Sequence, residues 1–461
     1  MLYTQKVLEA LARSREGFVG YQEGYLQRLE EARAALAALR TRYPMAQALE
    51  ATQQTIQREQ ALSVDGTSGT AQTSSVGARP TVEYDRWLHE PSMPALPTLP
   101  FGQSFANHEE SRAWAECLRG VTTFAVDGSQ LLPWRDASLP VALVQIGLFE
   151  NPHQPPAPYT KDAIVEVLSP EDLLFADSGG SQGMDERSGE DLGYSERITH
   201  LRRFELEIET IIARMQRHRD LRAAHPAQAA PLVVAFYDGS LIPSFALKSQ
   251  PPYRERYVRA SRLLLSASAA CRVPLVGYID TSYARDILSM LRALHMVGDA
   301  TSDQRDAGAA QNAQNTHGLH DALLWHGRLA WGDRTPAFIS ARYDLARLGF
   351  DADRSDGSED ATASEIAFVY FQAALDRPPA RLELPHWVLD AGLLDRVMDV
   401  VRAETIAGNG YPYPIESADA VAVISAPDRA QFYALFQTFA AREGLNISFS
   451  RKALSKSRRR V

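Results

Sequence analysis

The sequence predicts an α/β protein, in which a mixed β-sheet is flanked by helices and preceded by a helical extension that resembles a coiled coil. Two apolar runs of β-type residues, 124–126 and 233–237, each lead into the tripeptide Asp-Gly-Ser, at Asp127 and Asp238. Short apolar runs of this kind are typical of buried strands. From about residue 81 onward, strand-like and helix-like segments alternate, as they do in α/β domains.

The N-terminal element is a predicted helical region over residues 1–63. Apolar residues recur there at spacings of three and four, which is the pattern of one helix face: Leu26, Leu29, Ala32, Leu36 and Leu39. We expect this stripe either to pack in the core or to mediate self-association. Residues 64–80 are rich in Ser, Thr and Gly, and they predict a flexible linker ahead of a domain over residues 81–461.

The domain over residues 81–461 carries the remaining elements. Further strands are expected at 141–149, 232–237, 274–279, 366–371 and 380–384, and the first of these is expected to form a hairpin with the Asp127 strand. Helices are expected at 197–218, 254–270, 283–296, 388–406 and 428–443. Three segments without an apolar period, near 176–193, 300–317 and 351–363, predict disordered insertions.

Composition excludes several classes of protein. The 461 residues are 45% hydrophobic, yet they contain no apolar run of about 18 residues, so no membrane span is expected, and no signal peptide is recognised. Two distant cysteines, Cys117 and Cys271, predict a reducing, cytoplasmic location and no structural zinc site. The net charge of −9 excludes a uniformly basic surface. The basic C-terminal tail is expected to be solvated, with a phosphate-binding arm as the alternative.

The two Asp-Gly-Ser motifs are the strongest functional signal. Each is expected to place a carboxylate, Asp127 or Asp238, where a buried strand ends and glycine turns the chain. Carboxylate oxygens held at fixed points are the ligands that Mg²⁺ and Mn²⁺ prefer. The alternative is an ordinary turn, since Asp-Gly is a common hairpin signal. The shared context, with an apolar residue and Pro following each motif, favours the metal site.

Two further regions offer carboxylates. In the helix LRRFELEIETIIARM, Glu205 lies on the flank of the apolar face and Glu207 lies further round, while Asp419 falls on a helix-like segment after a Pro-rich turn. A solvated position is the alternative for each of them. Other catalytic signatures are missing from the sequence: it has no GxxxxGK[ST], HExxH or GxSxG string, which argues against an ATP-driven motor, a zincin protease and an α/β-hydrolase.

An ordered set of segments resembles the NurA nuclease family over about residues 118–440. The segments are AVDGSQLLP, VQIGLFE, FYDGSLIPSFA, LVGYIDTSYARDIL, WGDRTPAF, PARLELPHW and GNGYPYPIESADAVAVI. The resemblance implies an RNase H-like core, a Mn²⁺-dependent nuclease acting on DNA ends, a homodimer, and a HerA-type hexameric ATPase as partner in end resection. It implies no membrane association.

The resemblance also implies roles for individual residues. The two family aspartates fall on Asp127 and Asp238, the helix glutamate on Glu205 or Glu207, and Asp419 occupies the place of a family histidine. Such ligands would hold two Mn²⁺ or Mg²⁺ ions about 4 Å apart for phosphodiester hydrolysis.

Several other residues are expected near this centre. Tyr411 is expected to line the site, Asp280 to be an outer ligand or a helix N-cap, and Arg285 to lie nearby. Arg334 and Arg381 are candidate phosphate contacts, with ion pairs as the alternative.

The resemblance therefore implies a metal-dependent DNA nuclease that processes the ends of double-strand breaks together with a HerA-type ATPase. Two alternatives stay open. One is a catalytically impaired partner of such an ATPase that only binds DNA ends, because Asp419 replaces histidine. The other is a metal-dependent phosphoesterase that acts on nucleotides.

Overall fold

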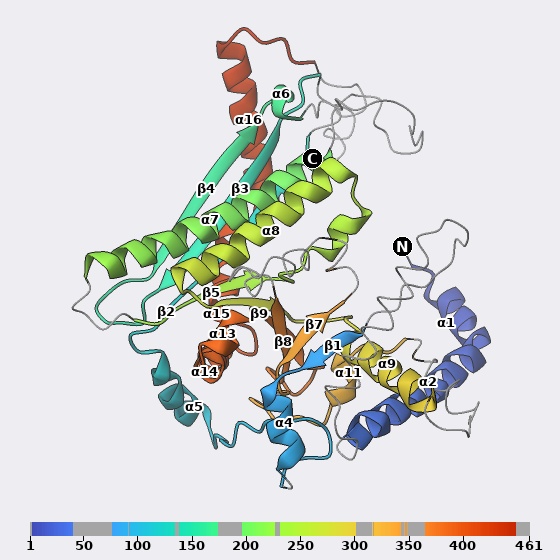
Figure 1. The fold of residues 1–461 in the computed structure, drawn as a ribbon. Coiled ribbons are helices and arrows are strands. Elements are labelled where there is room, and N and C mark those ends of the chain that lie inside the picture. Colours follow the sequence, from blue (N-terminus) through green and yellow to red (C-terminus); the bar gives the residue numbers. More distant parts are fainter. Residues whose placement is uncertain are drawn as a thin grey trace, which may run out of the picture. The chain divides into compact units, whose positions relative to one another are not determined.

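The computed structural model describes residues 2–39, 76–90, 92–133, 138–173, 196–225, 231–300, 316, 318–342, 345, 348 and 365–448. The chain forms two compact units (Figure 1). The first unit comprises Met1–Ala106 and Tyr278–Leu389, and the second unit comprises Asn107–Gly277 and Asp390–Val461. The chain therefore leaves the second unit after residue 277 and returns to it at residue 390.

The second unit is built on strands in the order β4-β3-β2-β5-β6. Their bounds are β2 Thr122–Leu131, β3 Ala142–Asn151, β4 Thr160–Leu168, β5 Val233–Asp238 and β6 Leu275–Ile279, the last of which reaches the boundary between the units. Strands β2, β3 and β4 form an antiparallel meander, and β5 runs parallel to β2. Helices α7 (Glu196–Ala224) and α8 (Pro251–Cys271) lead into β5 and β6. This order of strands and helices is the expected RNase H-like arrangement.

Helices cover both faces of these strands. The pair α7 and α8 lies on one face, and α15 (Tyr413–Ala422) packs on β2 and β3 from the other (Figure 1). Successive side chains of β2 point to opposite faces of the sheet. Phe124 stacks on His218 of α7, whereas the Thr123 hydroxyl donates to Glu404 of α14 (Leu394–Ala407). Odd-numbered side chains of β2 thus face α14 and α15, and even-numbered ones face α7.

The other elements of the second unit are shorter or lie at its margin. They are α5 (His108–Ala115), the 3₁₀ turns η2 (Glu116–Leu118) and η3 (Ser244–Lys248), α6 (Pro170–Leu173) and α16 (Ala426–Arg442). Helix α16 begins with a capping box, in which Ser425 and Asp428 bond each other's backbone N–H groups. Both cysteines, Cys117 and Cys271, are free thiols.

The first unit contains strands in the order β1-β7-β8-β9, each antiparallel to its neighbour. The strands are β1 Gly77–Pro80, β7 Phe338–Ala341, β8 Ile366–Phe371 and β9 Ala380–Pro385. The helices are α1 Thr4–Arg13, α2 Arg15–Ala38, α4 Val82–His89, α9 Asp286–Ala300, α11 Ala322–Trp325 and, at the boundary, α13 Trp387–Asp390. No helix among the described residues is both long and apolar enough to cross a membrane.

The N-terminal apolar stripe packs inside the first unit. Leu29, Ala32, Leu36 and Leu39 are buried in one cluster with residues of α4, α9 and β8, whereas Leu26 is 51% exposed. Of the two expectations for this stripe, core packing is confirmed. The stripe therefore gives no support to a dimer, because its side chains are already covered within the chain.

Several expected elements differ from the structure. Residues 77–80, expected to end the linker, form strand β1, and β4 was not expected at all. The expected helix 388–406 is divided into α13 and α14, because Gly392 adopts φ +65° between them. The segments 40–75, 176–193 and 351–363 and the basic tail from residue 449 lie outside the described residues, as does 300–317 except for Ala300 and Thr316.

Candidate active site

Asp127 and Asp238 are neighbours in the sheet of the second unit. The parallel register of β2 and β5 pairs Thr122 with Val233 and ends with Val126 opposite Tyr237. The next position of that register places Asp127 beside Asp238. Neighbouring strands lie about 4.8 Å apart, and side chains at one register position share a face, so the two carboxylates project together on the side of α15. The structure thus brings the two expected residues to one point.

The two Asp-Gly-Ser motifs have different conformations, which corrects the expectation that both end a strand. β5 ends at Asp238, and Gly239 turns the chain with φ +130°. β2 instead continues to Leu131, so Asp127 and Gly128 lie within a strand paired with β3. Gly128 is needed for close approach: a Cβ atom there would overlap Glu207 Oε1 and would lie 2.9 Å from Arg203 Cγ. The first glycine therefore admits helix α7 to the strand.

Glu207, and not Glu205, belongs to this site. Both glutamates are buried on α7. Glu205 turns toward α8, where Arg256 donates to both of its oxygens at 2.7 Å and 2.5 Å. Glu207 lies against Gly128, beside Asp127, and is paired with Arg203. Of the two glutamates left open by the sequence, Glu207 is therefore the one that the structure brings close to the aspartates.

Asp419 and Tyr411 complete the arrangement. The Asp419 carboxyl on α15 lies close enough to that of Asp127 to raise its pKa. Tyr411 precedes this helix, and its hydroxyl donates to Asp238 Oδ1 at 2.9 Å. Gly147 of β3, opposite Asp127, lets α15 approach, since a Cβ atom at Gly147 would lie 2.6 Å from Ala422 N and would overlap Ala418 O. Tyr411 therefore lies beside Asp238.

Burial and mutual repulsion perturb these carboxyls. Burial raises the pKa of Asp127 to about 6, and the charges of Asp238 and Asp419 add to the rise, while the Gly128 N–H acts against it. Burial also raises the pKa of Glu207 to about 8; Arg203 opposes this shift, and Asp127 and Asp238 reinforce it. Like charges gathered in this way favour protonation or a bound cation.

The donor set fits a hard divalent cation. Asp127, Glu207, Asp238 and Asp419 offer only carboxylate oxygens, which suit Mg²⁺ or Mn²⁺ better than soft metals. Asp238 and Asp419 are exposed, whereas Glu207 is buried, so the cluster has an open side. Within the described residues, no three His, Cys, Asp or Glu side chains are already spaced as they would be around a metal ion. Among the described residues, Arg203 brings a positively charged side chain next to the cluster, where it pairs with Glu207.

Four other expected residues lie in the first unit. Arg334 and Arg381 are 3% and 1% exposed. Arg334 donates to both oxygens of Glu83, and Arg381 pairs with Asp286 and Glu383. The structure thus favours the ion-pair alternative over phosphate contacts for these two arginines.

Asp280 and Arg285 also have partners within the first unit. Asp280 lies 3.5 Å from Arg377, and Arg285 bonds the Thr316 carbonyl at 3.0 Å. The N-cap expected of Asp280 is wrong, because α9 begins at Asp286 and its first N–H groups bond Asp321.

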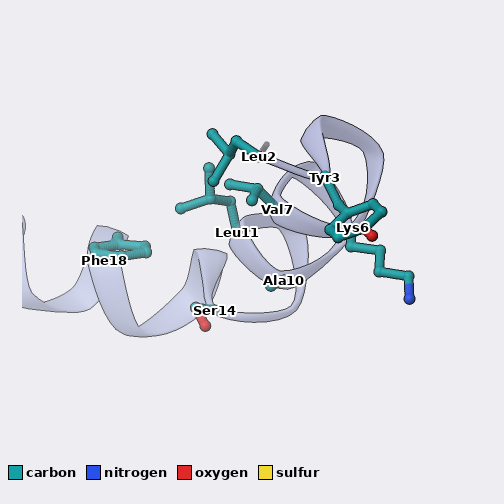
Figure 2. A pocket seen from close by; sticks show the side chains of 8 residues that line it. All are labelled: Leu2, Tyr3, Lys6, Val7, Ala10, Leu11, Ser14 and Phe18. Carbon is teal, nitrogen blue, oxygen red and sulfur yellow. The ribbon is translucent and has the colours of Figure 1, made fainter. Parts of the chain in front are cut away.

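A groove of about 470 Å³ on the N-terminal helices differs from the carboxylate cluster in chemistry (Figure 2). It is lined by Leu2, Tyr3, Lys6, Val7, Ala10, Leu11, Ser14 and Phe18. These side chains include no carboxylate, so the groove offers no ligand set for a hard cation.

Arg203 is the residue of the site that sequence reasoning missed. It stands four residues before Glu207 on α7, and an i,i+4 pair of opposite charge is the signal that identifies it. That signal was obscured because RRFELEIE also contains an i,i+3 pair of opposite charge, Arg202 and Glu205.

A family model and several solved structures are similar to this chain. The model of the NurA domain matches residues 121–424, which is more than half of the chain and includes all four carboxylates. Among solved structures, the chain is similar to a crystal structure of NurA with manganese, at 9% identity over 69% of this chain and 89% of that chain, with a TM-score of 0.29. It is also similar to one of NurA bound to dAMP and manganese, at 10% identity over 69% and 88%, with a TM-score of 0.31.

No match was found among curated proteins. With TM-scores this low, the two superpositions add nothing to the assignment, which rests on the family match. Because that match covers most of the second unit and extends through the helix carrying Asp419, the chain belongs to the NurA family.

Proposed function

We propose that this protein is a Mn²⁺- or Mg²⁺-dependent nuclease that hydrolyses DNA phosphodiesters with Asp127, Glu207, Asp238 and Asp419 as its metal ligands. The observation that carries the proposal is the register of β2 and β5, which puts two aspartates side by side at the end of a buried strand. Family membership supports it independently. The ligand set is close to the one expected from the sequence, with Glu207 chosen over Glu205.

The four carboxylates differ in exposure, and their proposed roles differ accordingly. Divalent cations at such a site supply Lewis-acid activation of water and offset the charge of the phosphodiester and its leaving oxygen. Asp238 and Asp419 are exposed and stand where a substrate can approach. The Tyr411 hydroxyl fixes the orientation of Asp238, and the Gly128 N–H donates to Asp127 Oδ1 at 2.7 Å. Buried Glu207 closes the inner side of the site.

The test is digestion of linear and closed circular DNA by the full chain, with Mn²⁺, with Mg²⁺ or with EDTA. We expect metal-dependent cleavage that Asp127→Asn and Asp238→Asn each abolish, because the amide keeps the shape of the side chain and removes its charge. Circular dichroism checks that both variants are folded. Cleavage by both variants at the wild-type rate would refute the site.

The other outcomes identify the two alternatives. DNA-end binding without cleavage would identify the impaired end-binding protein, and hydrolysis confined to free nucleotides would identify the phosphoesterase.

We also propose that the nuclease acts as a homodimer with a HerA-type hexameric ATPase in end resection. Membership of the NurA family supports this partnership. Light scattering should give about twice the chain mass of 51.0 kDa, and a HerA-type hexamer should retain the protein on a sizing column. A monomer at micromolar concentration would count against the dimer, and separate elution would count against the partnership.

A further inference from the structure

We propose that Arg203 is a positioning residue, which holds the Glu207 carboxylate against β2 in the orientation that the cation requires. The inference rests on the proposed metal site and extends it to a residue that contributes no ligand atom. It follows from the space at Gly128, from the bonds of the guanidinium, and from the contrast with a second arginine–glutamate pair on the same helix.

Strand β2 has space for Glu207 and Arg203 only because position 128 is a glycine. Gly128 lies on the face of β2 that packs against α7, where any side chain would meet Glu207 Oε1, Arg203 Cγ and Ile146 Cδ1. The space of the missing side chain is therefore filled by the Glu207 carboxylate and the Arg203 stem. Glycine at this position, next to the ligand Asp127, is the condition for Glu207 to reach the site.

The Arg203 guanidinium connects helix and strand. Its Nη1 donates to the Gly128 carbonyl oxygen at 3.2 Å and also to Glu207 Oε1. One nitrogen thus bonds the backbone beside Asp127 and a carboxylate of the cluster. The Glu207 side chain is only 6% exposed, so water cannot easily replace these bonds, and the rotamer of Glu207 is fixed relative to β2. Hydrogen bonds to a ligating carboxylate orient it in this way at metal sites.

The neighbouring pair shows what a purely structural ion pair looks like here. Arg256 of α8 uses Nε and Nη2 to bind both oxygens of Glu205. Arg203 is hydrogen-bonded to Oε1 of Glu207, and the other oxygen, Oε2, takes no part in that bond. The Arg203 Nε is buried and has no hydrogen-bond partner. Arg203 therefore does not bind both oxygens of its glutamate as Arg256 does. This is the geometry expected of a residue that orients a metal ligand and leaves one of its oxygens open to the cation.

The experiment measures Mn²⁺ binding directly, by electron paramagnetic resonance of free Mn²⁺ in titrations of the full chain without DNA. Arg203→Gln should weaken Mn²⁺ binding about 10- to 100-fold, the cost typical of losing an outer-shell partner. Arg203→Lys should recover part of the affinity, because its ammonium keeps the charge and can bond either the Gly128 carbonyl or Glu207. Arg256→Gln is the matched control and should change the affinity less than about twofold, as expected for an ion pair remote from the ligands.

Each outcome has a distinct meaning. Unchanged Mn²⁺ affinity in Arg203→Gln would overturn the inference, and tighter binding would overturn it in favour of Arg203 as a competitor of the cation. If Arg203→Gln unfolds, a wild-type affinity in the folded Arg203→Lys variant refutes positioning by the two bonds of Arg203 Nη1. Failure of the wild type itself to bind Mn²⁺ or to cleave DNA would refute the proposed function as well, and so is distinguishable from failure of the inference alone.

Discussion

Glu404 of α14 should make the stability of the protein depend on pH, and Glu404→Gln should remove that dependence. The carboxyl is 1% exposed. The Thr123 hydroxyl donates to its Oε1 at 2.6 Å, while Oε2 is buried and has no hydrogen-bond partner. Burial raises the pKa of Glu404 from 4.5 to about 7, and the Thr123 bond only partly opposes the rise. The folded state therefore keeps a proton that the unfolded state releases.

The sign and size of the effect follow from this difference. Below pH 4.5 the carboxyl is protonated in both states and contributes nothing. As the pH rises to about 7, only the unfolded state ionises, so the free energy of unfolding falls by about 1.4 kcal/mol per pH unit. The total is roughly 3 kcal/mol, which is the pKa difference converted at that rate. A glutamine stays neutral at every pH, so its curve should lack this decline.

Urea unfolding followed by tryptophan fluorescence, at fixed ionic strength from about pH 4.5 to pH 8, measures the difference. The unfolding free energy of Glu404→Gln minus that of the wild type should rise by roughly 3 kcal/mol across this range. A constant difference would refute the reasoning. It would mean that Glu404 is ionised in the folded protein, paired with a protonated His153, whose Nε2 lies 3.4 Å away. Burial lowers the pKa of His153, which argues against that pair.

Three further predictions concern the site. Glu207→Gln should abolish Mn²⁺-dependent cleavage and Glu205→Gln should retain it, because Glu207 lies against Gly128 and its pKa is raised by the aspartate charges, whereas Glu205 is paired with Arg256; equal loss in both would contradict the assignment. Gly128→Ala should lower both the activity and the midpoint of urea unfolding, since the added Cβ overlaps the Glu207 carboxylate. An unchanged midpoint would show that α7 can move to make room for the methyl group. Asp419→Ala should sharply reduce activity, whereas Asp419→His should restore part of it; wild-type cleavage by Asp419→Ala would leave three protein ligands.

The strands around the site could be predicted because each is a continuous apolar run. Segments 141–149 and 232–237 form β3 and β5, and the hairpin with the Asp127 strand is confirmed. The edge strand β4 escaped detection because it is exposed along most of its length, so burial imposes no apolar run on it.

The helix pattern alone could not show which glutamate lies close to the aspartates. Glu205 and Glu207 are both buried, because one faces α8 and the other faces β2. Helical spacing gives the angle between them but not the side on which each neighbour lies. For the same reason, the same tripeptide Asp-Gly-Ser forms a turn at Asp238 and lies within a strand at Asp127. Tertiary packing decides which of these two conformations it adopts.

Arg334 and Arg381 show a different limit of sequence reasoning. An arginine is usually exposed, and only its partner determines whether it can be buried. Glu83 is 251 residues from Arg334 along the chain, and Asp286 is 95 residues from Arg381. Pairs so distant in sequence leave no local pattern.

The return of the chain to the second unit sets the order in which the residues of the candidate active site are synthesised. Asp127, Glu207 and Asp238 precede the excursion through residues 278–389, whereas Asp419 follows it, 181 residues after Asp238. At about 5–20 residues per second, translation of that interval takes roughly 10–40 s. Until then the nascent polypeptide has neither Tyr411 to hold Asp238 nor α15 to carry the last carboxylate. The proposed nuclease activity should therefore begin only after helix α15 has left the ribosome.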